Sequence, residues 1–170
     1  YKNGIPTHLI TWLYAGCFIV FAMVVIGGIT RLTGSGLSIT EWKVVTGTFP
    51  PLTRQAWEEE FASYKQTPQY VGINSHFNLD DFKNIYWWEY LHRLVGRMLG
   101  FVFLGGSAWF YFKNQISRTL APKLIVMFLL GAWQGFLGWY MVLSGLVGGA
   151  SVSHYRLAIH LINAFLTFGY

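Results

Sequence analysis

The chain has 170 residues, of which 54% are hydrophobic, 19% aromatic and only 11% charged. Soluble domains carry about 25% charged residues, so this composition excludes an ordinary soluble domain and indicates an integral membrane protein. The net charge of +5 is interpreted as a sign of topology, because basic residues concentrate in short cytoplasmic loops, and no nucleic-acid partner is expected. The single cysteine, Cys17, excludes an intrachain disulfide and predicts a packed free thiol.

Four apolar segments predict the fold class: an all-α integral membrane protein with a four-helix transmembrane bundle, formed by residues 1–170 as one unit. A helix crosses a hydrocarbon core of about 30 Å with about 20 residues. Asn78 is a candidate N-terminal cap for an earlier start of the second helix. The fourth segment is marginal in length, and we expect it to continue beyond Tyr170. The predicted spans are 9–30, 86–112, 124–146 and 152–170.

The connections between these segments predict the orientation. The connection 113–123 contains three basic residues and no acid, whereas the loop 32–85 contains four basic and six acidic residues. The basic connection should face the cytoplasm or the matrix, with the N-terminus on that side and the long loop outside. The spacing of Trp57, Phe61 and Tyr64 predicts a short amphipathic helix in that outer loop.

Ionisable residues occur inside the second apolar segment, where they are costly and therefore mark a candidate functional site. Glu89 precedes His92 by three residues and Arg93 by four, so all three share one side of a helix. The simplest interpretation of Glu89 and Arg93 is an intrahelical ion pair. A carboxylate beside a candidate ligand is also suited to moving protons or stabilising positive charge.

His92 and His160 are predicted at matching depths, about 9 to 12 Å below the outer surface of the membrane. Two imidazoles at equal depth on separate helices suit the axial ligands of one iron in a flat macrocycle. The alternative is that each is a buried histidine bonded to a neighbouring helix. His154 is about 240° away from His160 around a helix, so we assign His160 as the ligand and His154 as an interfacial residue.

Two further arginines, Arg97 and Arg156, are candidates for binding acidic substituents of such a cofactor. For Arg156, extension of the side chain towards the membrane interface is an equally good interpretation. Gln134 lies in the middle of the third predicted span and is expected to form a hydrogen bond between packed helices.

Three sequence motifs resemble the haem A synthase family: GGITRLTGSGLSITEW after the first span, EYLHRLVGR in the second, and HYRLAIHL at the start of the fourth. In that family, eight spans form two similar four-helix halves, and this chain is similar to the N-terminal half. The resemblance implies that Glu89 is the essential carboxylate and that His92 and His160 are the paired haem ligands. We also expect Arg93, Arg97 and Arg156 to bind the cofactor. The absence of a cysteine pair from the outer loop resembles the class typical of mitochondria and alphaproteobacteria.

The resemblance also implies a reaction, the oxidation of a methyl group of haem O to the formyl group of haem A for terminal oxidases. A haem b is expected in the second half, which this chain lacks. The expected location is the bacterial cytoplasmic membrane or the mitochondrial inner membrane. Besides the lipid bilayer and haem O, candidate partners are haem O synthase, an electron donor and a second copy of the chain. The alternatives are a b-type membrane cytochrome that only transfers electrons and a helical bundle without a cofactor.

Overall fold

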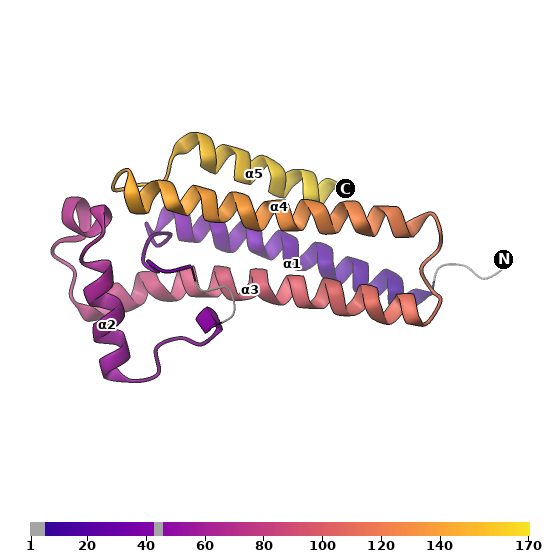
Figure 1. Cartoon of the computed structure of the whole chain (residues 1–170), viewed down its shortest axis with the longest axis horizontal. Coiled ribbons are helices and arrows are strands. Elements are labelled where there is room, and N and C mark those ends of the chain that lie inside the picture. The colour runs from indigo at the N-terminus through magenta and orange to yellow at the C-terminus, as the bar shows by residue number, and fades with distance from the viewer. Residues whose placement is uncertain (1–5, 43–45) are drawn as a thin grey trace.

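The computed structural model describes residues 6–42 and 46–170, and its described part consists of helices and their connections without strands. Four long helices lie side by side along the long axis of the molecule (Figure 1). Shorter helices gather at one end, in the segment that joins the first two long ones. The long helices are α1 (Thr7–Leu32), α3 (Leu79–Phe112), α4 (Leu120–Val147) and α5 (His154–Gly169); the short ones are η1 (Thr46–Thr48), α2 (Arg54–Tyr64) and η2 (Tyr70–Asn74).

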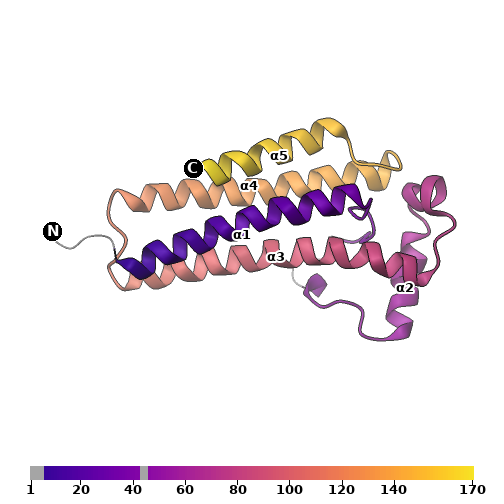
Figure 2. The same ribbon diagram turned by 180° about the vertical axis from the view of Figure 1, so that it is seen from behind.

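The long helices associate as two antiparallel pairs. Helix α1 packs along α3, and α4 packs along α5. Contacts of α1 with α5 and of α3 with α4 join the two pairs (Figure 2). A site formed by residues of α3 and α5 therefore takes one residue from each pair.

Among the described residues, α1, α3 and α4 have the length and apolar composition of membrane spans. Large apolar side chains on them face away from the other helices, as lipid-facing residues do; Phe18 and Phe101 are 71% and 76% exposed. Cys17 is also exposed on α1, so the prediction of a packed thiol is wrong. Helix α5 has 16 residues, about 24 Å at 1.5 Å per residue, and a fourth span over 152–170 is not confirmed.

Helix α3 begins at Leu79 because of a local signal in the sequence. The Asn78 side chain accepts hydrogen bonds from the backbone N–H groups of Asp80 and Asp81, and Asp81 in turn accepts one from the Asn78 N–H. This capping box satisfies donors that the first turn leaves free. The helix of 34 residues is about 51 Å long, and its first turns carry the residues that hold the joining segment.

An aromatic cluster attaches α2 to the start of α3. Phe61 and Tyr64 on α2 stack against Phe82 of α3 with ring centroids 5.1 and 5.2 Å apart, and Trp57 meets Tyr86 edge to face at 4.9 Å. The helix expected around these α2 residues is present. Its location on the outer side of a membrane stays a prediction.

Candidate functional site

Glu89 lies on α3 with only 3% of its surface exposed, and its carboxylate is surrounded by donors. One oxygen, Oε2, accepts hydrogen bonds from the backbone N–H of Ser38 at 2.7 Å, from the Ser38 hydroxyl at 2.7 Å and from the Ile39 N–H at 2.9 Å. The other, Oε1, accepts a charge-assisted hydrogen bond from Arg93 one helical turn later. Because a buried carboxylate is stable only when paired and hydrogen-bonded, these contacts explain how the Glu89 side chain is accommodated inside the protein.

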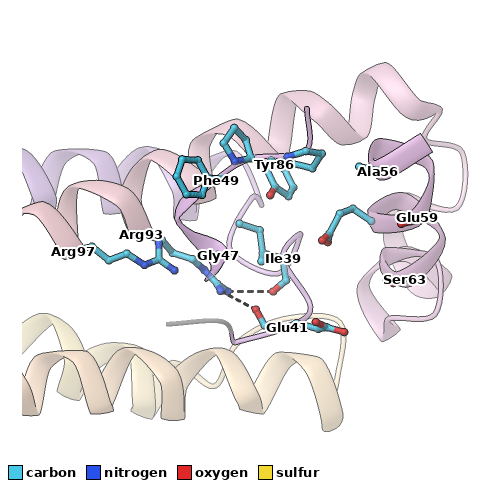
Figure 3. A pocket seen from close by; sticks show the side chains of 13 residues that line it. Ile39, Glu41, Gly47, Phe49, Ala56, Glu59, Ser63, Tyr86, Arg93 and Arg97 are labelled. Carbon is cyan, nitrogen blue, oxygen red and sulfur yellow. Dashed lines mark hydrogen bonds between the residues drawn. The ribbon is translucent and has the colours of Figure 1, made fainter. Parts of the chain in front are cut away.

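The Arg93 guanidinium makes further contacts with residues 39–42. It donates to the carbonyl oxygens of Ile39 at 3.1 Å and Glu41 at 3.4 Å (Figure 3). It also lies over the Trp42 ring, 5.0 Å from the centroid, in the range of a cation–π contact. The intrahelical ion pair expected from the sequence is therefore confirmed, and it also holds the segment 38–42.

The residues just before this segment, Gly34 and Leu37, are also held by contacts with other parts of the chain. Gly34 has a φ of +66°, a left-handed conformation that glycine adopts without strain. Its carbonyl accepts a hydrogen bond from Gln69, whose oxygen accepts one from the Tyr64 hydroxyl. Burial raises the pKa of Tyr64, which keeps that hydroxyl protonated as a donor. Leu37 packs so closely on Gly145 of α4 that a Cβ there would lie 2.7 Å from its methyl groups.

His92 lies on α3 and packs against α1. A Cβ added to Gly27 would lie 2.7 Å from Cε1 of the imidazole, so only glycine at this position admits the ring. Nδ1 of His92 is buried and has no hydrogen-bond partner among the described residues. Such an orphaned polar atom is uncommon in folded proteins and asks for an explanation.

His160 repeats this arrangement in the other helix pair. Its ring lies against Gly138 of α4, where a Cβ would lie 3.1 Å from Cε1, and its Nδ1 is likewise buried without a described partner. Its Nε2 lies 3.2 Å from the side-chain nitrogen of Gln134. Gln134 also bonds Asn163 of α5, which confirms the expected hydrogen bond between packed helices.

These observations test whether the residues fit an axially ligated haem. Two imidazoles come from different helix pairs, each has a buried Nδ1 without a partner among residues 6–42 and 46–170, and each rests on a glycine that leaves room for the ring. Within the part of the chain that the structure describes, no group of three His, Cys, Asp or Glu side chains could hold a bare metal ion. The donor set therefore fits an iron whose other ligands come from a macrocycle.

The arginines expected at the site occupy different places. Arg93 and Arg97 line one pocket of about 440 Å³ between the joining segment and α3 (Figure 3). Arg156 lies on α5, where it donates to the Tyr140 carbonyl at 2.8 Å and stacks over the Tyr140 ring at 3.7 Å. His154, the first residue of α5, is exposed. The structure thus groups Arg93 and Arg97 and leaves Arg156 separate from them.

The sequence matches a family model described as cytochrome oxidase assembly protein (COX15-CtaA) over residues 10–170. The chain belongs to this family. Curated relatives named heme A synthase include those of Flavobacterium psychrophilum, 52% identical over 95% of the chain and 48% of the relative, and of Rhodospirillum centenum, 54% identical over 96% and 44%. The heme A synthase of Parvibaculum lavamentivorans is 53% identical over 99% and 49%. The chain spans about half the length of these curated relatives, and no solved structure matches it.

Sequence reasoning on this family member missed several residues that surround the candidate site. Ser38 was part of a recognised motif, but nothing local showed that it faces Glu89, which lies 51 positions away. Gly27 and Gly138 were not distinguished from the other glycines. Asn163 could have been found, because it follows His160 by three residues and therefore shares its side of α5.

Proposed function

We propose that this chain forms a haem-binding half of a haem A synthase, which oxidises a methyl group of haem O to the formyl group of haem A. The observation that carries the proposal is the pair His92 and His160, which come from different helix pairs and each rest on a glycine of a neighbouring helix. The curated relatives named heme A synthase support the same reaction. The proposal also places this half in a bacterial cytoplasmic or mitochondrial inner membrane.

In this proposal, His92 and His160 hold haem O as substrate through their imidazole nitrogens. Bound haem O supplies the methyl group that is oxidised. Arg93 and Arg97, which line one pocket, bind its propionates. Arg156 is a third candidate for this role, although its contacts with Tyr140 place it apart.

Glu89 is the proposed catalytic carboxylate. It is one helical turn from His92 on the same helix and carries a charge that four hydrogen bonds stabilise. To take or give a proton near the substrate, it must exchange one of these hydrogen bonds for a contact with the substrate or its water. The Ser38 hydroxyl is the group best suited to turn away, because it rotates about one side-chain bond, whereas the two N–H groups belong to the backbone and Arg93 is also held by the Ile39 and Glu41 carbonyls.

Further parts of the proposal concern the surroundings. The N-terminus lies on the cytoplasmic or matrix side, a second half carries a haem b, and an electron donor serves the reaction. Haem O synthase is the proposed supplier of substrate, and a second copy of the chain is a candidate partner. These follow from the charge of the loops and from the family resemblance.

The deciding experiment replaces Glu89 by Gln in the natural full-length protein. Glutamine retains the shape and an acceptor for Ser38 and Ile39 but removes the charge, so we expect haem to remain bound while haem A formation falls to background. Chromatography of haems extracted from the purified protein measures both. Haem A at the wild-type level would contradict the catalytic role of Glu89.

The second candidate function is a b-type cytochrome that only transfers electrons. The arrangement of two histidines on separate helices favours it, since bis-histidine ligation suits electron transfer. A wild-type protein that contains haem b alone and forms no haem A when supplied with haem O would establish this function in place of the first.

A further inference from the structure

The two histidines of the site differ in one respect. Nε2 of His160 accepts a hydrogen bond from Gln134, whereas no such contact to Nε2 of His92 is seen among the described residues, and its Nδ1 is buried without a described partner. Nε2 is the nitrogen at the tip of the ring, farthest from the backbone. The hydrogen bond from Gln134 to this nitrogen therefore distinguishes His160 from His92.

The direction of the Gln134 bond follows from its neighbours. The Asn163 side-chain nitrogen lies 3.2 Å from the backbone carbonyl of Leu130 and 2.7 Å from the side-chain oxygen of Gln134. A carbonyl only accepts, so the Asn163 amide must present its NH₂ group to Leu130, and the same NH₂ group faces the Gln134 oxygen. The NH₂ group of Gln134 therefore faces His160.

This direction determines the state of the His160 ring. Because the Gln134 NH₂ group can only donate, Nε2 must carry a lone pair, and the single ring proton of the neutral imidazole lies on Nδ1. A histidine that binds iron through Nε2 needs the same tautomer. Leu130, Asn163 and Gln134 thus prepare His160 for ligation while they occupy the lone pair that ligation would use.

We propose that Gln134, oriented by Asn163, is a positioning residue that competes with haem iron for Nε2 of His160, so that His160 is the exchangeable axial ligand and His92 the retained one. This inference rests on the proposed haem site. Were haem held through Nε2 of His160, release of that nitrogen would restore the Gln134 hydrogen bond, which would lower the free-energy cost of release. His92 has no equivalent compensation among its described neighbours.

An exchangeable ligand has a consequence for a site that treats haem as substrate. Two firmly bound imidazoles would leave no free axial position and would retain the product. If His160 released its nitrogen more readily than His92, haem would enter and leave the site while His92 kept it oriented against α1 and α3.

The inference is tested by carbon monoxide binding to the reduced, haem-loaded, full-length protein, because carbon monoxide must displace an axial ligand. In Gln134→Met, which retains the side-chain length, the open form loses one hydrogen bond, and we expect binding about five-fold slower than in wild type. Gln115→Met is the matched control, since it removes the exposed His8–Gln115 hydrogen bond at the far end of the bundle and should leave the rate unchanged. His160→Ala, which binds carbon monoxide without a displacement step, identifies the signal of this site.

A second measurement does not depend on the folding of a Gln134 variant. If His92 is the retained ligand, His160→Ala should keep more haem after gel filtration than His92→Ala does. An unchanged or faster rate in Gln134→Met, or greater haem retention in His92→Ala, would overturn the inference while leaving the haem site in place. If neither histidine variant alters the haem content or the low-spin absorption, the proposed haem site itself fails.

Discussion

The Glu89 cluster and the histidine pair both include residues of α3, Glu89 and His92, but they differ in how fully their polar atoms are hydrogen-bonded. Both oxygens of Glu89 are hydrogen-bonded, and its neighbour Arg93 is paired as well. His92 and His160 instead each keep a buried nitrogen without a described partner. The first arrangement is satisfied without any added group, whereas the second leaves a polar ring atom of each histidine without a described hydrogen bond.

This difference suggests separate tasks for the two regions. The Glu89 cluster fastens the segment 38–42 onto α3, and the histidines remain available for a ligand. Removing a residue from the first should therefore lower stability, and disturbing the second should lower haem binding with little loss of stability. Three substitutions test this division.

The largest effect is expected for Glu89→Ala. Loss of one partner from a buried ion pair leaves Arg93 without its counter-charge and Ser38 and Ile39 without their acceptor, so the free energy of unfolding should fall by about 3–5 kcal/mol. Thermal unfolding in detergent measures this fall. Glu58→Ala is the control, because Glu58 belongs to an exposed pair with Arg54 and should cost at most about 1 kcal/mol. Equal losses of stability in the two variants would show that the Glu89 cluster stabilises the fold no more than an exposed ion pair does.

A smaller effect of a different kind is expected for Gly27→Ala. The new Cβ would lie 2.7 Å from the His92 ring, so the imidazole must shift and haem binding should weaken about ten-fold. The free energy of unfolding should fall far less than in Glu89→Ala, because the helix propensity of alanine offsets part of the cost of shifting the ring. Gly16→Ala on the same helix meets nothing within 4 Å and serves as control. Haem titration measures both, and equal affinity in the two variants would show that the ring does not depend on the glycine.

The smallest effect is expected for Ser38→Ala, which removes the hydroxyl donor and leaves both backbone N–H groups on Glu89. One hydrogen bond to a charged group contributes about 1.5 kcal/mol, so the loss of stability should be well below that of Glu89→Ala. Ser63→Ala, at an exposed position of α2, is the control. Haem binding should be unchanged in both variants. A loss of haem on replacing Ser38 would mean that the segment 38–42 also supports the ligand site.

Much of the fold followed from local patterns. The predicted spans 9–30, 86–112 and 124–146 lie within α1, α3 and α4, because the apolar length that a membrane requires can be counted along the chain. The cap at Asn78 and the pair of Glu89 with Arg93 were also predictable, since each joins residues within one turn of helix. The choice of His92 and His160 rested on their positions in these segments and stays a prediction.

The sequence by itself determined the features that depend on residues close together along one helix. These are the apolar spans, the cap, the ion pair and the candidate histidines. Only the tertiary structure decided what faces them. Ser38 and Ile39 on Glu89, Gly27 beneath His92, and Gln134 on His160 each join residues that are 26 or more positions apart. No periodic pattern records such contacts, because they depend on how the segment 33–42 turns and on which faces of α1, α3, α4 and α5 pack together.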